Sequence, residues 1–304
     1  MVIKERAAVS QDLSGAKFNF LTIIVKVNVF ISADIEGITG LVSWSQCGRP
    51  NGDHYDFGFA RRMMTHDVNA AVRGARKAGA ERIVIKDSHG NSKNLLIDDL
   101  EAGVELISGH GSGRDGMMEG IDETFHAAFL IGYHAKAGSA EGIMEHTYTG
   151  RAHRLFVNEI ELGEMGLSAA TAGRYGVPLA MVSSDDKGCA EAYAMFPGVH
   201  TVVTKHGIGR YMGRLLHPSE TGPLIEATAE QALKNLNQPW TIKGECVVRL
   251  EVNRTEDADW AARIPGVTRI DGYSVSVTAA SYEEAQSWAV VLMSVGTLGM
   301  GAND

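Results

Sequence analysis

Two acidic residues with one residue between them follow an apolar segment near the start of the chain, in the stretch ISADIEGITG at residues 31–40. Side chains two positions apart along a strand point to the same side, so Asp34 and Glu36 bring two carboxylates close together. Neighbouring carboxylates repel each other unless a cation or a shared proton lies between them. The stretch therefore predicts a site that needs a positively charged partner.

Other apolar segments along the chain also finish in acids or histidines. These residues are Asp87, Ser88 and His89 after ERIVIK, His134 after FLIGY, and Asp185 with Asp186 after AMVSS. Ligands of open α/β sheets bind beyond the carboxyl ends of the strands, where side chains of neighbouring strands would converge. Converging carboxylates and imidazoles predict a divalent metal site. Asp87, Asp185 and Asp186 have two interpretations, either as partners that orient ligating imidazoles or as caps and turn hydrogen bonds.

Alternating strands and helices are expected to position these residues. VKVNVFIS at 25–32 and ERIVIKDSHG at 81–90 are rich in β-branched residues and predict strands. Apolar residues at three- and four-residue steps predict a helix over 57–78 between them. Further apolar segments at 125–134 and 177–186 continue the alternation. The pattern predicts an α/β fold with a mostly parallel sheet flanked by helices.

The pattern changes past about residue 240. Three strands are expected at 246–252, 267–271 and 273–279, and Ser281 with Glu284 forms a capping box that opens a last helix. An earlier hairpin is expected at 155–162. We therefore divide the chain into a disordered or weakly ordered extension (1–24), a metal-binding catalytic α/β domain (25–240) and a smaller α/β domain (241–304).

The overall composition narrows the function classes. The 304 residues are 44% hydrophobic and 21% charged, with a net charge of −9, which argues against nucleic acid or an anionic membrane as partner. No apolar segment reaches the length of a transmembrane helix. Three widely spaced cysteines without a CxxC pair argue against a disulfide scaffold and fit a reducing cytoplasm, where we expect the protein.

Two other motifs do not support competing chemistry. GSGRDG at 111–116 matches a nucleotide-binding glycine pattern, but too few residues follow it for the helix that a pyrophosphate needs. Cys47 has no identifiable base beside it, which argues against a thiol nucleophile. The metal site remains the principal hypothesis.

Several short motifs occur together in an order typical of one enzyme family. They are SADIEG (32–37), DSHG (87–90), GYHAKA (132–137), EGIMEH (141–146), GEMGL (163–167) and SDDK (184–187). In this combination the chain resembles the zinc-dependent D-aminopeptidase family from about Lys26 to its end, with the strongest likeness before residue 240.

The resemblance implies a ligand set and a catalytic residue. It implies two zinc ions per subunit, with Asp34 as bridging ligand and with Glu36, His89, His134 and Glu164 completing the set. Five protein ligands with one bridge would give each ion three protein contacts. The resemblance also places the catalytic histidine at His146, whose role as proton shuttle, stabiliser of the tetrahedral intermediate or covalent nucleophile stays open.

The function that follows is a dizinc aminopeptidase that releases an N-terminal D-amino acid from short peptides or amides. The preference for D-residues comes from the resemblance alone, as does a ring-type homo-oligomer such as a decamer. Two alternatives remain: another dinuclear-metal hydrolase, such as a phosphoesterase, and a non-catalytic α/β small-molecule-binding protein. Metal content separates the last of these from the enzymes, and a substrate panel separates the two enzymes.

Overall fold

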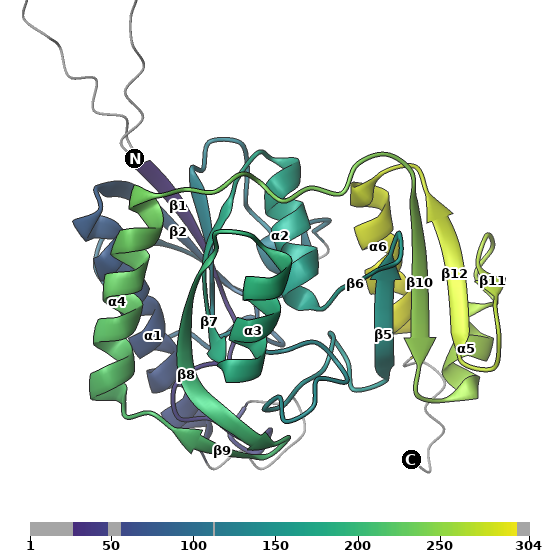
Figure 1. The fold of residues 1–304 in the computed structure, drawn as a ribbon, viewed down its shortest axis with the longest axis horizontal. Helices are drawn as coiled ribbons and strands as arrows, with labels where there is room; N and C mark the ends of the chain where they lie inside the picture. Colours follow the sequence, from purple (N-terminus) through teal and green to yellow (C-terminus); the bar gives the residue numbers. More distant parts are fainter. Residues whose placement is uncertain (1–26, 48–55, 112, 297–304) are drawn as a thin grey trace, which may run out of the picture.

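The computed structural model describes residues 27–47, 56–111 and 113–296 of the chain. The N-terminal extension predicted at 1–24 lies outside the described residues. The described part contains two sheets side by side, each with its own helices (Figure 1). Among the described helices, none has the length and apolar character needed to cross a membrane.

The larger sheet has seven strands in the order β3-β2-β1-β4-β7-β8-β9. All neighbouring pairs are parallel except the edge pair β8 and β9, so the predicted, mostly parallel α/β sheet is confirmed. The strands are β1 (Val27–Ala33), β2 (Ala80–Asp87), β3 (Glu105–Ile107), β4 (Ala127–Ile131), β7 (Leu179–Asp185), β8 (His200–Gly209) and β9 (Met212–Leu215).

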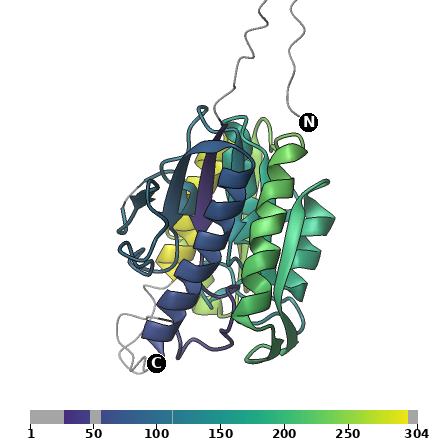
Figure 2. The same cartoon turned by 90° about the vertical axis from the view of Figure 1, so that its left-hand side faces the viewer.

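Helices cover both faces of this sheet because its central strands are apolar on both sides. On β1, Val29 and Ile31 pack into the core beneath α1 (Phe57–Lys77) and α4 (Pro218–Lys234), whereas Phe30 faces the opposite core. That opposite core includes residues of α2 (Glu164–Arg174), α3 (Asp186–Met195) and the short 3-10 helix η1 (Gly116–Met118). Figure 2 shows α1 and α4 lying side by side. The two helices can approach closely because Gly74 has no side chain: a Cβ at this position would lie 2.1 Å from the Glu226 carbonyl oxygen.

The smaller sheet has five antiparallel strands in the order β11-β12-β10-β5-β6. Its strands are β5 (Ala152–Val157), β6 (Ile160–Glu161), β10 (Cys246–Val252), β11 (Thr268–Arg269) and β12 (Ser274–Ala279). The predicted hairpin at 155–162 supplies β5 and β6, so this sheet takes strands from both sides of residue 240.

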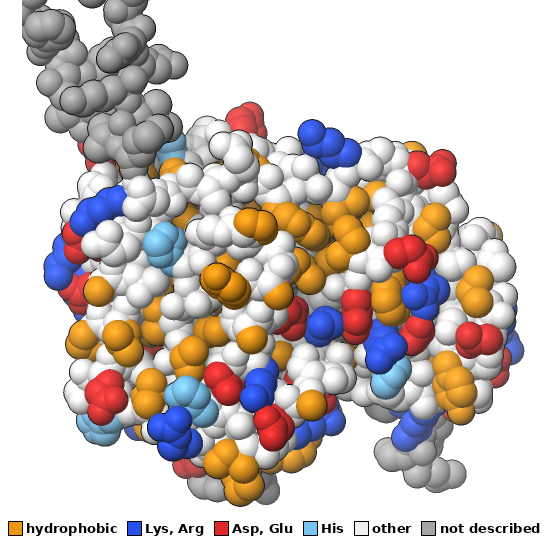
Figure 3. All heavy atoms as spheres, viewed as in Figure 1, with side chains coloured by type: hydrophobic (Ala, Val, Ile, Leu, Met, Phe, Trp, Pro, Cys, Tyr) orange, Lys and Arg blue, Asp and Glu red, His pale blue; other side chains and the backbone are white. Residues whose placement is uncertain are grey.

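Two helices, α5 (Thr255–Ala261) and α6 (Tyr282–Gly296), cover one face of the smaller sheet and share its apolar core. The predicted capping box opens α6: Glu284 N donates to Ser281 Oγ at 3.3 Å, and the Glu284 carboxylate accepts from Ala280 N at 2.7 Å. The other face carries acidic and basic side chains in alternation (Figure 3). These include the pair of Arg154 with Glu161, whose closest atoms lie 3.7 Å apart.

Candidate metal centre

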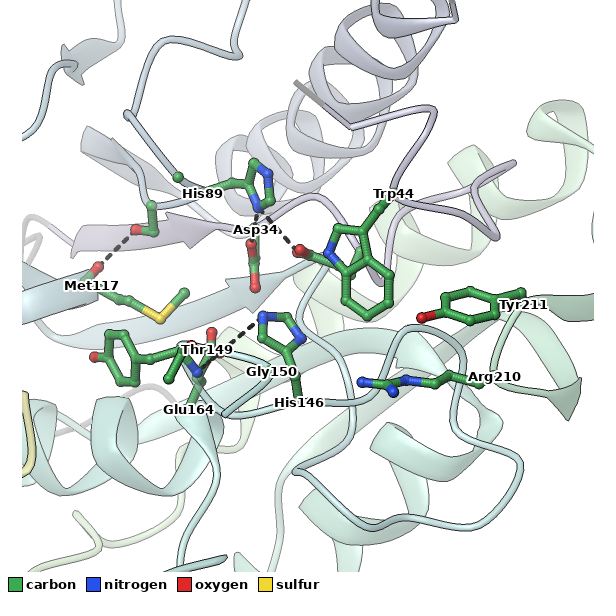
Figure 4. Close-up of a pocket in the computed structure, with 14 residues that line it drawn as sticks. Asp34, Trp44, His89, Met117, His146, Thr149, Gly150, Glu164, Arg210 and Tyr211 are labelled. Carbon is green, nitrogen blue, oxygen red and sulfur yellow. Dashed lines mark hydrogen bonds and ion pairs between the residues drawn. The ribbon is translucent and has the colours of Figure 1, made fainter. Parts of the chain in front are cut away.

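Three neighbouring strands of the larger sheet deliver the predicted metal ligands to one edge. The ends of β1, β2 and β4 are level with one another, because Ala33 pairs with both Asp87 and Ile131. Asp34 follows β1 at once, His89 comes two residues after β2, and His134 three residues after β4. Since the strands are parallel, their carboxyl ends meet at the same edge, as Figure 4 shows for Asp34 and His89.

The side chains form a continuous set of short contacts. His89 Nδ1 lies 3.3 Å from Asp34 Oδ1 and 3.1 Å from Glu36 Oε2. His134 Nε2 lies 3.5 Å from Asp34 Oδ2 and 3.3 Å from Glu164 Oε1. Asp34 thus turns one oxygen toward each of two histidines, which is the arrangement that a bridging carboxylate needs.

The segment after β1 holds its two acids through contacts with the end of β4. Asp34 N donates to the Ile131 carbonyl at 2.8 Å, and Gly37 N donates to the Gly132 carbonyl at 2.7 Å. A Cβ at position 37 would lie 1.7 Å from the Tyr133 carbonyl oxygen, so only glycine permits this approach. Glu164 reaches the centre differently, as the first residue of α2, where the helix dipole favours a carboxylate.

His146 lies on a loop rather than at a strand end. Its ring stacks on His134, with centroids 4.1 Å apart and planes 10° from parallel, and Trp44 packs edge-on against it at 5.6 Å. His146 Nε2 lies 3.6 Å from Glu164 Oε1. Its Nδ1 lies 2.9 Å from the Met144 carbonyl oxygen, and because a carbonyl only accepts, Nδ1 carries the proton. In the neutral ring, Nε2 is therefore the basic nitrogen, and it faces the carboxylates.

The loop that carries His146 has unusual backbone conformations. Three non-glycine residues adopt positive φ angles, with values of 61° at Glu141, 53° at Met144 and 56° at Tyr148. The left-handed region costs a non-glycine residue about 1–2 kcal/mol. Hydrogen bonds hold the loop in this state: Ile143 N donates to Asp185 Oδ2 at 2.6 Å, and Tyr148 N to Glu164 Oε1 at 2.7 Å.

The donor set fits zinc. Within the described parts of the chain, Asp34 Oδ2 and His134 Nε2 are buried and have no hydrogen-bond partner. His134 Nδ1 faces the Ala135 carbonyl at 3.0 Å, which fixes its proton there and leaves Nε2 free to ligate. Two groups have ligand atoms within 4.8 Å of one another: Asp34, Glu36 and His134, and His134, His146 and Glu164. Nitrogen and carboxylate ligands at such spacing suit Zn²⁺.

The pKa shifts of Asp34 and His89 also indicate a site that favours a bound cation. Burial and the charge of Glu36 raise the pKa of Asp34 to about 7. Burial lowers the pKa of His89, but the charge of Glu36 and hydrogen bonds to both carboxylates outweigh it and raise that pKa to about 10. The negative charge of Glu36 contributes to both shifts, and a bound metal cation would offset this buried negative charge.

The predicted residues are distributed as follows. Asp34, Glu36, His89, His134, His146 and Glu164 lie together, while the three further aspartates bind backbone groups. Asp87 accepts from Asn94 N at 2.6 Å, Asp185 from Gly188 N at 2.7 Å and Asp186 from Gly207 N at 2.8 Å. These contacts match the cap-and-turn interpretation, and the orienting contacts to His134 come from backbone instead.

A pocket of about 490 Å³ opens onto the centre and adds residues that the sequence patterns did not reveal. Trp44, Arg210 and Tyr211 line it together with Asp34, Glu36, His89, His146 and Glu164. Arg210 lies over the Trp44 ring at 5.2 Å and its Nε is 3.2 Å from Glu145 Oε1. Figure 4 shows its guanidinium pointing toward His146. Arg210 lies in the turn between β8 and β9, and nothing in the local sequence indicates that it lines a pocket.

Strand ends of an α/β sheet, the start of α2 and a neighbouring loop together bring three carboxylates and three histidines around one pocket, which defines a metal-dependent hydrolase type of site. Comparison with known proteins gives the family. A family profile described as D-aminopeptidase matches residues 27–291. A D-aminopeptidase of Bacillus subtilis (strain 168) is 34% identical over 244 residues, which are 79% of this chain and 86% of that protein.

A solved structure extends the likeness to three dimensions. It is described as the Zn-dependent D-aminopeptidase DppA from Bacillus subtilis, a self-compartmentalizing protease. The match has a TM-score of 0.84 at 30% identity and covers 89% of this chain and 98% of that one. The chain therefore belongs to the D-aminopeptidase family, and the predicted family resemblance is confirmed.

Proposed function

We propose that this chain is a dizinc D-aminopeptidase in which Asp34, Glu36, His89, His134 and Glu164 hold two zinc ions and His146 is catalytic. The observation that carries the proposal is the position of Asp34, whose two oxygens face His89 and His134 from one buried carboxylate. A bridging ligand at Asp34 would give one ion Glu36 and His89, and the other His134 and Glu164. When bound, zinc supplies Lewis acidity, which acidifies water and polarises a scissile carbonyl.

His146 supplies proton chemistry beside that centre. Its Nδ1 proton is held by the Met144 carbonyl, so the ring presents Nε2 to the pocket and can take up a proton there. The same proton can then pass to the leaving amine. The stacked His134 and the edge-on Trp44 fix the plane of the His146 ring. Covalent attack by Nε2 and stabilisation of the tetrahedral intermediate are the other roles open to it.

The pocket combines acidic and basic side chains, which suits a short peptide with two charged termini. Beside the carboxylates and histidines of the centre, Arg210 is the only Lys or Arg among the described residues that line it. We propose that Arg210 binds the free C-terminal carboxylate of the substrate, while Trp44 and Tyr211 contact its side chains. A phosphoesterase would require more basic residues at the centre, so the pocket favours the peptide.

A proposal about the oligomeric state rests on the solved structure that this chain resembles. Because DppA is described as self-compartmentalizing, we propose that this chain also forms a homo-oligomeric ring that encloses its active sites. A decamer and a cytoplasmic location stay predictions. All three cysteines are buried, and Cys47 and Cys246 pack into the apolar cores of the larger and the smaller sheet.

The test combines metal analysis with a chiral substrate panel. Purified protein reconstituted with zinc is expected to hold about two ions per chain, and to hydrolyse D-aminoacyl dipeptides faster than their L-counterparts. One ion or none after reconstitution would contradict the dinuclear site. Equal rates on both enantiomers would contradict the proposed substrate class without affecting the metal assignment.

A further inference from the structure

A lysine from a distant strand lies beneath the segment that carries Asp34 and Glu36. Lys205, on β8, is fully buried. Its Nζ donates to the carbonyl oxygens of Glu36 at 2.5 Å, Ile38 at 2.9 Å and Leu41 at 2.7 Å. An ammonium has three N–H groups, so these three carbonyls use all of them. The lysine thus ties together three backbone positions of one short segment, 36–41.

The origin of these contacts lies in the sheet order. Two strands, β4 and β7, separate β8 from β1, so the segment after β1 must cross their ends to reach Lys205. The neighbouring Thr204 donates from its Oγ1 to the Gly37 carbonyl at 2.7 Å. From the other side, Asp67 on α1 accepts from Thr39 N at 2.8 Å. The segment is therefore held from both sides along its length, and Lys205 makes the largest number of these bonds.

A charged donor suits this task better than a neutral one. Hydrogen bonds that involve a charged group are roughly twice as strong as neutral ones. Lysine offers a compact ammonium with donors in three directions, whereas the donors of the arginine guanidinium all lie in one plane. A buried ammonium without these acceptors would be unfavourable, so the segment and the lysine require each other.

We propose that Lys205 is a positioning residue that sets the zinc affinity of the centre by holding Glu36 in place. The inference rests on the proposed function, since it takes zinc as the metal. Groups that orient metal ligands typically change metal affinity by about 10–100-fold when removed. Lys205 acts through the backbone of the ligand and does not touch the metal or the substrate.

The sign of the effect separates positioning from simple electrostatics. A buried positive charge near a cation site repels the cation, so if Lys205 acted through its charge, removing it would tighten zinc binding. If it acts by holding Glu36, removing it weakens zinc binding, because the carboxylate is no longer held where the ion needs it. The two mechanisms predict opposite changes in the same dissociation constant.

The experiment is zinc titration of Lys205→Met in competition with a chromogenic chelator. Zinc is expected to bind 10- to 100-fold more weakly than to the wild type. The rise in Tm that zinc produces should shrink accordingly, since ligand stabilisation follows affinity. Lys205→Gln, which keeps two donors and no charge, is expected to fall between the two proteins. Unchanged or tighter zinc binding in Lys205→Met would overturn the proposal.

A stability control distinguishes positioning from general damage. Leu250→Ala removes a fully buried side chain from the smaller sheet and should lower Tm while leaving zinc affinity within about twofold of wild type. If Leu250→Ala weakens zinc binding as much as Lys205→Met does, the effect of the lysine is global and the proposal is wrong. If the wild type itself binds no zinc, the proposed function fails instead.

A measurement on the wild type covers the case in which neither lysine variant folds. Because Lys205 holds the segment without help from a metal, amides of residues 37–41 should stay protected from hydrogen exchange after zinc is removed by chelation. Protection that disappears with zinc would show that the metal, and not Lys205, holds the segment, and would overturn the proposal.

Discussion

The two segments that bring functional side chains to the centre are held in different ways. Residues 34–41, which carry Asp34 and Glu36, follow a central strand and are bound by groups from β8 and α1. The loop 138–150, which carries His146, has three non-glycine residues in the left-handed region and depends on Asp185 and Glu164 to hold it. One segment is a fixed extension of the sheet, and the other is a constrained loop.

This difference matches the two kinds of chemistry proposed for the centre. Metal ligands must hold a geometry within a few tenths of an ångström, which rigid strand ends provide. A proton-transfer group must approach a substrate, and such groups are often found on loops with strained backbones. We therefore expect changes in the first segment to affect metal content and changes in the second to affect turnover.

The largest expected effect comes from Asp34→Ala. It removes the ligand proposed to contact both ions, so we expect loss of at least one zinc per chain and a loss of activity beyond about 10⁴-fold. Metal analysis and D-aminoacyl hydrolysis measure the two quantities. Asp257→Ala removes another fully buried acid, far along the chain in α5, and should keep zinc while lowering Tm. Full metal and activity in Asp34→Ala would rule out the bridging assignment.

His146→Ala is expected to separate turnover from metal binding. If His146 transfers a proton, kcat should fall by about 10²–10⁴-fold with zinc content unchanged. His153→Ala, on the exposed side of β5, is the matched control and should behave as wild type. Zinc loss together with activity would instead make His146 a ligand, as its grouping with His134 and Glu164 allows. Near-normal kcat would make it a structural residue.

Arg210→Met tests the proposed contact with the substrate carboxylate. A charged hydrogen bond to the substrate carboxylate contributes about 1.5–3 kcal/mol, so kcat/KM for a D-dipeptide should fall by about 10- to 100-fold. The corresponding dipeptide amide lacks that carboxylate, and its kcat/KM should change by less than about threefold. Arg214→Met, which removes an exposed arginine from β9, serves as control. An equal loss on both substrates would mean that Arg210 supports the loop through Glu145 and does not recognise the carboxylate.

The same difference explains what could be predicted from the sequence. Asp34, Glu36, His89 and His134 follow strands, and strands of this kind are visible in the pattern of apolar residues. Glu164 at a helix start and His146 on a loop have no such signal, and only the family resemblance indicated them. The sequence did not indicate a role for Lys205 or Arg210, because their contacts join residues far apart in sequence. Lys205 and Glu36, for example, are 169 positions apart. The sequence pattern also did not predict four elements around these contacts, the helices α3 and α4 and the strands β8 and β9.

The smallest expected effect concerns the left-handed residues themselves. Glu141 in the His146 loop and Glu159 in the β5–β6 turn have similar φ angles of 61° and 64°, and both side chains are exposed. Glycine adopts this region without the steric cost, but it also gains freedom in the unfolded chain. Glu159→Gly should therefore raise the free energy of unfolding by about 0.5–1 kcal/mol and leave kcat unchanged.

Glu141→Gly should show a smaller gain in stability, because it removes a closer ion pair: Glu141 lies 3.0 Å from Lys187, whereas Glu159 lies 3.9 Å from Arg249, and an exposed pair contributes about 0–1 kcal/mol. Its kcat should fall a few-fold, on the order of 1 kcal/mol of barrier, since glycine loosens the loop that fixes His146. Chemical denaturation and steady-state kinetics on both variants measure the comparison. If Glu141→Gly matches Glu159→Gly in both stability and kcat, the left-handed conformation at 141 does not contribute to placing His146.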